Sequence, residues 1–236
     1  MSKAKSSSDP AEIFRNEWPT YKKVLDCNYM FHREIYHDLG RFLERRFASR
    51  SFSILELGCG DASQTARALA NCQVSAYRGY DLSDIALKDA ARNLAALHCD
   101  VRLSCAHLLS GLAESEGGYD VVFSSFALHH LTLDEKRRFF SLSHRALKDN
   151  GVLLLVDVIR AEHEDRPTYL RSYLGHLAEH WSALTEEELL SVSAHIEGND
   201  FPETPSLYRA MAQELGFPQA QQLSQHAWHQ SWCFHR

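Results

Sequence analysis

From residue 52 onward, short apolar stretches alternate with amphipathic ones, and this alternation constrains the fold more than any other feature of the sequence. The apolar stretches predict strands near 52–57, 75–80, 100–104, 119–124 and 151–158. The stretches between them predict helices near 62–71, 83–97 and 134–148. Such an alternation is typical of βαβ units, in which helices cover both faces of a parallel sheet. Right-handed crossovers would bring the loops that follow the strands to the carboxyl edge of this sheet.

The turn after the first predicted strand has the composition of a ligand-binding loop. Residues 56–63 are ELGCGDAS, and glycines let a backbone turn tightly and lie against a small molecule. A dinucleotide-binding turn, G-x-G-x-x-G/A, would need a small residue where Ser63 stands, and Asp61 would repel its phosphates. The carboxylates of Glu56 and Asp61 instead suit a ligand that is cationic near the turn. S-adenosylmethionine, which carries an ammonium and a sulfonium but no phosphate, is such a ligand.

Four ordered segments resemble motifs of the class I S-adenosylmethionine-dependent methyltransferases. They are the acid-x-G-x-G turn at 56–60, YDLS at 80–83, YDVVFSSFALHHL at 119–131 and LKDNGVLLL at 147–155. The resemblance covers roughly residues 50–160 closely and the flanks more loosely. It implies an α/β fold: a Rossmann-like, seven-stranded and mostly parallel sheet with helices on both faces and an antiparallel last strand. A Rossmann-like domain that binds something else, such as a nicotinamide dinucleotide, is the alternative.

The resemblance also implies which residues contact S-adenosylmethionine. Asp81 ends the second strand about 20 residues after the glycines, a spacing at which a carboxylate commonly accepts hydrogen bonds from a ribose diol. After the third strand the family usually has an acidic residue for the adenine amino group. This sequence has His107 there, which would accept through a neutral ring nitrogen unless the backbone makes the contact. The predicted cofactor-binding residues are Tyr21, Glu56, Gly58, Cys59, Gly60, Asp61, Asp81, Leu82, His107 and Ser124.

The sequence predicts one catalytic domain with two helical additions. Residues 1–9 are predicted to form a disordered tail and 10–48 to form N-terminal helices that cover the cofactor, the first of them ending at Pro19. The methyltransferase domain is predicted at 49–236. Residues 160–204 form an insertion after the fifth strand, which in this family commonly becomes a helical cap over the substrate pocket. These additions favour a closed pocket for a small molecule over an open groove.

Methyl transfer from a sulfonium is an in-line displacement at carbon, so positioning the acceptor and excluding water can lower most of the barrier. An acceptor that is protonated at working pH also needs a general base, and a histidine with a pKa of about 6.5 suits that task. His129 is predicted to face the substrate and His195 is a second catalytic candidate, whereas His130 is predicted to order its loop. The predicted substrate contacts are Tyr29, His32, His129, Tyr169, Tyr173 and Phe201, with ordinary packing as the alternative for each.

Two groups of histidines could be metal ligands by residue type, but their spacing predicts no metal site. Residues 176–180, HLAEH, fit the H-x-x-E-H pattern of some zinc enzymes, but they lie in the insertion with no third ligand in view. His226, His229 and His235 do not share one face of a strand.

Composition limits the remaining function classes. The 236 residues carry a formal net charge of −6 and no evident basic stripe, which argues against a nucleic-acid partner. No apolar run is long enough to span a bilayer, so the expected location is cytoplasmic and no membrane partner is expected. The predicted activity is transfer of a methyl group to O, N or S of a small molecule, releasing S-adenosylhomocysteine. The alternative is a catalytically silent homologue that binds S-adenosylmethionine as a partner or regulatory subunit. The sequence makes no prediction of oligomeric state.

Overall fold

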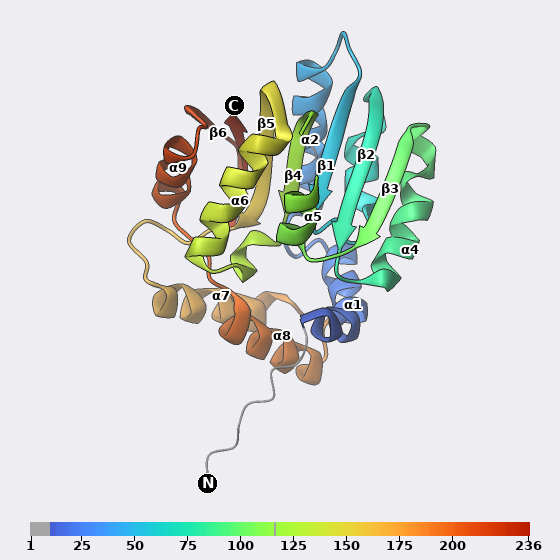
Figure 1. Cartoon of the computed structure of the whole chain (residues 1–236). Helices are drawn as coiled ribbons and strands as arrows, with labels where there is room; N and C mark the ends of the chain where they lie inside the picture. Colours follow the sequence, from blue (N-terminus) through green and yellow to red (C-terminus); the bar gives the residue numbers. More distant parts are fainter. Residues whose placement is uncertain (1–9, 116) are drawn as a thin grey trace.

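Seven strands form one sheet in the order β3-β2-β1-β4-β5-β7-β6 (Figure 1). The computed structural model describes residues 10–115 and 117–236, so the predicted disordered tail lies outside the described residues. The strands are β1 (Phe52–Leu57), β2 (Val74–Asp81), β3 (Asp100–Cys105), β4 (Tyr119–Ser125), β5 (Leu147–Val158), β6 (Gln219–His226) and β7 (His229–His235). β1 to β5 pair in parallel, and β7 is antiparallel to both of its neighbours. The predicted fold class is confirmed.

The strand order reverses between β1 and β4, which are neighbours in the sheet although two strands separate them in sequence. In an open α/β sheet, ligands bind outside the carboxyl ends of the strands at such a switch point. The glycine-containing turn follows β1 and the His129–His130 segment follows β4. The topology therefore brings these two motifs to the same edge.

Helices cover both faces of the sheet because β-strand side chains alternate between the faces. Along β5, Leu153 and Leu155 pack with one layer, and Leu154 and Val156 pack with the other. The first layer contains α5 (Leu108–Glu114), α6 (Leu133–Ala146) and α9 (Pro205–Glu214). The second contains α2 (His32–Arg46), α3 (Ser63–Ala68) and α4 (Asp84–Asn93).

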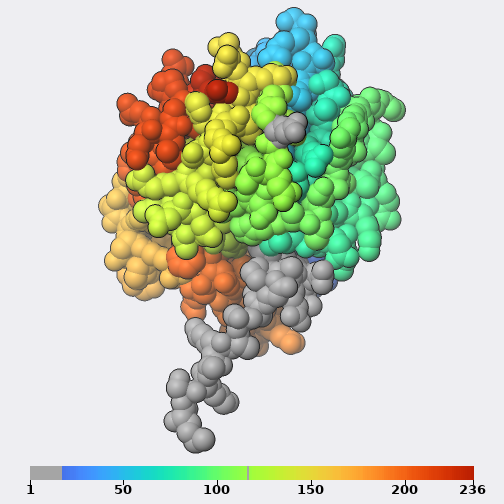
Figure 2. Space-filling model, viewed as in Figure 1, coloured from blue at the N-terminus to red at the C-terminus, as the bar shows by residue number. Residues whose placement is uncertain are grey.

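Three further helices gather beyond the carboxyl ends of the strands: α1 (Pro10–Asp26), α7 (Arg166–His180) and α8 (Glu186–Asn199) (Figure 1). They share a third apolar cluster that includes Val24, Tyr173 and Ile196. In Figure 2, α8 forms the orange surface below the α5–α6 face. No helix in residues 10–115 and 117–236 has the combination of length and apolar character that crossing a bilayer requires.

The prediction that Pro19 ends the first helix is wrong, since α1 continues to Asp26. A proline inside a helix removes one backbone hydrogen bond and costs about 3 kcal/mol. Burial of Val24 beyond the proline contributes to offsetting this cost, which the local sequence does not reveal.

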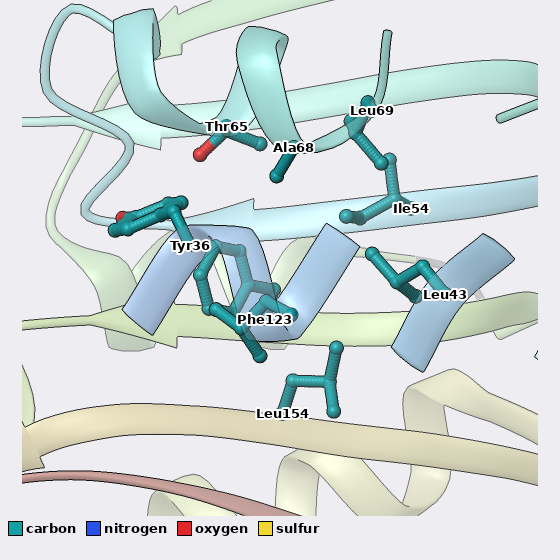
Figure 3. Close-up of a pocket in the computed structure, with 9 residues that line it drawn as sticks. Tyr36, Leu43, Ile54, Thr65, Ala68, Leu69, Phe123 and Leu154 are labelled. Atoms are coloured by element: carbon teal, nitrogen blue, oxygen red, sulfur yellow. The ribbon is translucent and has the colours of Figure 1, made fainter. Parts of the chain in front are cut away.

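A small cavity lies between α2 and the sheet (Figure 3). Its volume is about 10 Å³, close to the minimum that one water molecule needs. Its lining consists of Tyr36, Leu39, Leu43, Ile54, Thr65, Ala68, Leu69, Phe123 and Leu154. The cavity is a gap in core packing and is too small for a ligand.

Candidate active site

The turn after β1 adopts a conformation that favours glycine. Gly58 and Gly60 have φ angles of 74° and 52°, in the left-handed region. The backbone amides of Gly58 and Cys59 both donate to the carbonyl of Tyr80 on β2, at 2.8 and 3.0 Å. A Cβ added at Gly58 would lie 3.0 Å from the Cβ of Ala127, so the loop after β4 packs directly against this turn.

Asp81, at the end of β2, lies beside the turn as the spacing predicted. Its Oδ2 accepts a hydrogen bond from the Gly60 amide and its Oδ1 accepts one from the Ser83 amide, both at 2.8 Å. Burial raises the pKa of Asp81, and these backbone hydrogen bonds oppose the rise. Each carboxylate oxygen can accept a second hydrogen bond, so the same side chain has capacity for a ribose diol. That contact stays a prediction.

Helix α1 packs over the glycine turn that follows β1. The indole of Trp18 would lie 3.7 Å from a Cβ added at Gly60. Tyr21 is close enough to Asp61 and Asp81 that burial, followed by the charges of these two carboxylates, raises its pKa. The carboxylate of Asp61 accepts from the Ser63 amide at 3.0 Å, at the start of α3. The predicted neighbourhood of Tyr21, Asp61 and Asp81 is therefore present.

Two predicted cofactor contacts have their side chains engaged inside the protein. Glu56 is 1% exposed, and its carboxyl oxygens accept from Thr65 Oγ1 at 2.8 Å and from the Tyr77 hydroxyl at 2.5 Å. Ser124 is fully buried and donates to the Leu57 carbonyl at 2.8 Å, which ties β4 to β1. Both side chains hold β1 in place next to the turn. This geometry favours a positioning role over direct contact with a ligand.

The ends of β2 and β3 lie together where the adenine was predicted. The Ala106 amide donates to the Asp81 carbonyl at 3.0 Å, and Cys105 Sγ lies 3.4 Å from the Leu82 carbonyl oxygen. His107 is the N-cap of α5, and its Nδ1 accepts from the Leu109 amide at 3.3 Å. This capping contact fixes the ring, and the adenine contact through Nε2 stays a prediction.

The two adjacent histidines after β4 differ in burial. The side chain of His129 is 7% exposed and that of His130 is 20% exposed. His129 Nδ1 lies 2.5 Å from Asp157 Oδ1 on β5. Burial lowers the pKa of His129, whereas the carboxylates of Asp200 and Asp157 raise it, and the net direction is upward. These contacts give His129 the loop-ordering position that the sequence analysis assigned to His130.

A cluster of aromatic and imidazole rings lies between α1, α2, the loop after β4, α7 and β7. We call it the aromatic cluster, and it consists of Tyr21, His32, Phe126, Tyr173 and His229. The His32 and Phe126 rings are 4.8 Å apart, and Phe126 and His229 are 5.8 Å apart. Hydrogen bonds join the Tyr21 hydroxyl to His32 Nε2 at 3.3 Å and the Tyr173 hydroxyl to His229 Nε2 at 3.1 Å.

Burial lowers the pKa of His32 and of His229 to about 3, so both rings are neutral at pH 7. The Nδ1 atoms of both histidines and the Tyr169 hydroxyl are buried with no hydrogen-bond partner among the described residues. The sequence analysis named His32, Tyr169 and Tyr173 as substrate contacts but missed His229. Its place at the start of an apolar strand that pairs with β5 was the available signal.

The other predicted residues lie outside this cluster. Tyr29 stacks on Trp181 with ring centroids 5.2 Å apart, and its hydroxyl accepts from the Ala183 amide at 2.7 Å. Phe201 is 39% exposed and lies 4.7 Å from the guanidinium of Arg166. His195, on α8, packs edge-on against His130 at 5.2 Å. Tyr29 packs against the same apolar cluster as Tyr173 and Phe126, whereas the ring contacts of Phe201 and His195 lie elsewhere.

Comparison with known proteins agrees with the sheet order and the glycine turn. Residues 54–151 match a family model described as a methyltransferase domain. An uncharacterised methyltransferase of Staphylococcus carnosus is 21% identical over 162 residues, covering 69% of this chain and 74% of that protein. One from Synechocystis is 34% identical over 131 residues, covering 54% of this chain and 56% of that protein.

Solved structures with low sequence identity share the fold. The plantazolicin methyltransferase BpumL, solved in complex with SAH, has a TM-score of 0.62 at 12% identity and covers 98% of this chain and 91% of its own. A protein of Nostoc punctiforme has a TM-score of 0.62 at 14% identity, with 88% and 57% covered. Residues 54–151 are similar to a methyltransferase domain, and the solved structures share the Rossmann-like fold of the S-adenosylmethionine-dependent methyltransferases.

Proposed function

We propose that this protein binds S-adenosylmethionine at the β1–β4 edge and transfers its methyl group to O, N or S of a small-molecule acceptor. The observation that carries the proposal is the Asp81 carboxylate bonded to the Gly60 amide inside the glycine turn. This contact joins the predicted ribose ligand to the turn at the topological switch point. The similarity of residues 54–151 to a methyltransferase domain supports the same ligand.

The residues around the turn fit the charges of this ligand. Asp61 offers a carboxylate for a cationic group near the turn, and Asp81 offers hydrogen-bond acceptors for a diol. Trp18 and Tyr21 of α1 would exclude water from the ligand. S-adenosylmethionine supplies an electrophilic methyl on an excellent leaving group, so that the acceptor–carbon bond forms as the sulfur–carbon bond breaks. The protein then has to position the acceptor in line and keep water out.

The aromatic cluster supports a flat, uncharged acceptor that forms hydrogen bonds. Its members contribute ring faces, tyrosine hydroxyls and two neutral imidazoles, and none of them is a lysine or an arginine. An anionic acceptor would therefore find no countercharge from the cluster. The unpartnered Nδ1 atoms of His32 and His229 are available to pair with acceptor polar groups. The side chains of His32 and His229 are both 1% exposed, so an acceptor that pairs with them would be shielded from water.

Calorimetric titration with S-adenosylmethionine and S-adenosylhomocysteine tests the cofactor part of the proposal. We expect micromolar binding to the unaltered protein, and at least a tenfold loss in the Asp81→Ala and Asp81→Asn variants. Asp100→Asn, at the far end of β3, is the matched control and should bind normally. Absence of binding by the folded wild-type protein would contradict the proposal.

Measurement of methyl-transfer turnover distinguishes an active enzyme from a catalytically silent homologue. A panel of uncharged phenols, heterocyclic amines and thiols would be incubated with S-adenosylmethionine, and released S-adenosylhomocysteine would be measured. Turnover that His32→Ala or His229→Ala reduces, with cofactor binding intact, supports the acceptor site. Tight cofactor binding without turnover of any panel member supports the silent homologue.

A further inference from the structure

Three potential metal ligands from two distant parts of the chain come together at the loop that follows β4. They are His129 and His130 in the short helix η2 (Leu128–His130), and Asp200 directly after α8. One ligand atom from each lies within 4.8 Å of the other two. Asp200 Oδ1 is 3.4 Å from His130 Nδ1 and 3.9 Å from His129 Nε2. We call these three residues the His-His-Asp group.

The spacing of these atoms is compatible with a shared tetrahedral metal ion, which would replace the present contact of His130 Nδ1 with the Asn199 carbonyl oxygen at 3.4 Å. Zinc bound to imidazole nitrogen at about 2.0–2.1 Å in a tetrahedral site places neighbouring ligand atoms about 3.4 Å apart. The 3.9 Å separation between Asp200 and His129 exceeds hydrogen-bond length. An ion bound among the three atoms, which lie within 4.8 Å of one another, would draw them closer together.

Asp200 provides an independent indication that a ligand belongs here. The residue is 3% exposed, and its Oδ1 is buried with no hydrogen bond of acceptable geometry among the described residues. A buried carboxylate oxygen without a donor costs several kcal/mol of desolvation energy unless a cation lies beside it. The oxygen points toward the imidazole nitrogens of the group, where an ion would sit.

The ring of His129 is already oriented as a metal-bound histidine would be. Asp157 Oδ1 lies 2.5 Å from His129 Nδ1, so this nitrogen carries a proton and Nε2 faces Asp200, where it would offer its lone pair to a metal once it is deprotonated. Metal-bound histidines commonly donate their second nitrogen to a carboxylate in this way. Asp157 is itself fixed, because its Oδ2 accepts from the Tyr208 hydroxyl at 3.2 Å and its Oδ1 from the Val158 amide at 3.0 Å.

The backbone around the group is also fixed. The Phe201 amide donates to the His129 carbonyl at 2.7 Å, and Arg166 Nε donates to the Asp200 carbonyl at 2.7 Å. The first bond joins the end of the insertion to η2, and the second joins it to α7. The ligand atoms therefore meet at a preorganised junction between the insertion and the parallel sheet.

We propose that the His-His-Asp group binds a divalent transition-metal ion, with zinc as the preferred ion. His129 Nε2, His130 Nδ1 and Asp200 Oδ1 are its protein ligands, and a fourth position is open to water or to a heteroatom of the acceptor. The ion would fasten the insertion to the loop after β4. Two nitrogens and one carboxylate oxygen form a ligand set that zinc commonly takes. This site is independent of S-adenosylmethionine binding.

The test is calorimetric titration of chelator-treated protein with ZnCl₂, together with metal analysis of the untreated protein. We expect one zinc per chain with a Kd at or below micromolar. Asp200→Asn should weaken binding at least tenfold, and Asp157→Asn, which removes only the orienting carboxylate, should weaken it about 10–100-fold. Co²⁺ added in place of zinc should give the visible absorption of a tetrahedral site in the wild-type protein but not in Asp200→Asn.

The pair His176 and His180 on α7 supplies the matched control, because their rings stack at 4.2 Å and offer a competing surface site. His176→Gln/His180→Gln should keep the zinc affinity of the unaltered protein. Zinc binding that this double variant loses and Asp200→Asn retains would overturn the proposal. So would an absence of zinc binding, which would leave His129 as an imidazolium between Asp157 and Asp200. Circular dichroism checks folding, and Asp200→Ser replaces any Asp200→Asn preparation that fails to fold.

Discussion

Glu56 lies directly beneath the glycine turn, but its environment changes the role that the sequence analysis gave it. Burial raises the pKa of its carboxyl to about 8, against the opposing hydrogen bonds from Tyr77 and Thr65. The group is therefore mostly protonated at pH 7 and contributes little negative charge. Attraction of a cationic ligand then depends on Asp61 and Asp81, and Glu56 serves to fix the strand beneath them.

Replacing Glu56 by Gln should change how stability depends on pH. A carboxyl whose pKa is raised by folding contributes stability that is fully present below about pH 4.5 and is lost as pH rises through about 8. The side-chain amide of the Glu56→Gln variant does not titrate, so its stability lacks this dependence on pH. Relative to Glu56→Gln, the wild-type protein should become progressively less stable between pH 5 and pH 9 in urea denaturation. A stability difference that stays constant over this range would contradict the prediction.

The surroundings of two helical glycines predict opposite changes in unfolding free energy when each is replaced by alanine. A Cβ at Gly111 on α5 would lie 2.4 Å from the buried ring of Tyr80, whereas a Cβ at Gly175 on α7 meets no atom within 4 Å. Gly111→Ala should cost about 1–3 kcal/mol of unfolding free energy through overpacking. Gly175→Ala should gain up to about 1 kcal/mol from helix propensity. Equal effects of the two changes in chemical denaturation would show that the α5–β2 contact is loose.

At the scale of elements, the sequence located the strands and most helices because their hydrophobic periodicity is local. The insertion at 160–204, which is expected to be helical, contains α7 and α8. The active-site loop was less predictable, because the partners of His129 are Asp157 on β5 and Asp200 after α8. Only the folded topology brings these residues together. The contacts of His229 could not be predicted for the same reason, since its partner Tyr173 lies on α7.

A buried lysine on helix α6 holds the end of the insertion in place. Lys136 on α6 is fully buried and donates to the Phe201 carbonyl and to Glu203 Oε1, the latter at 2.9 Å. Lys136→Met should cost about 3–5 kcal/mol, because Glu203 would lose its nearer cationic partner in a mostly buried place and keep Arg160, 3.9 Å away. Arg137→Met removes an exposed pair with Glu214 and should cost no more than about 1 kcal/mol. Similar losses for both variants in urea denaturation would contradict this assignment.

For the whole molecule, ligand binding should appear as thermal stabilisation. S-adenosylhomocysteine at 100 times its Kd would add about 2.7 kcal/mol to the unfolding free energy. For a chain of 236 residues this corresponds to a rise in Tm of about 5–10 °C. The Asp81→Asn variant should show a smaller rise at the same concentration, and NAD should produce none. An equal shift with NAD would favour a dinucleotide site.

The position of β7 between β5 and β6 has a consequence for biosynthesis. The ribosome makes residues 229–235 after both strands that they separate. Until then β5, with its apolar run Val152–Val156, presents an unpaired edge in the nascent chain. Such an edge is a template for pairing with another chain. Translation that stalls before residue 229 should therefore yield an aggregation-prone fragment that depends on chaperones for its solubility.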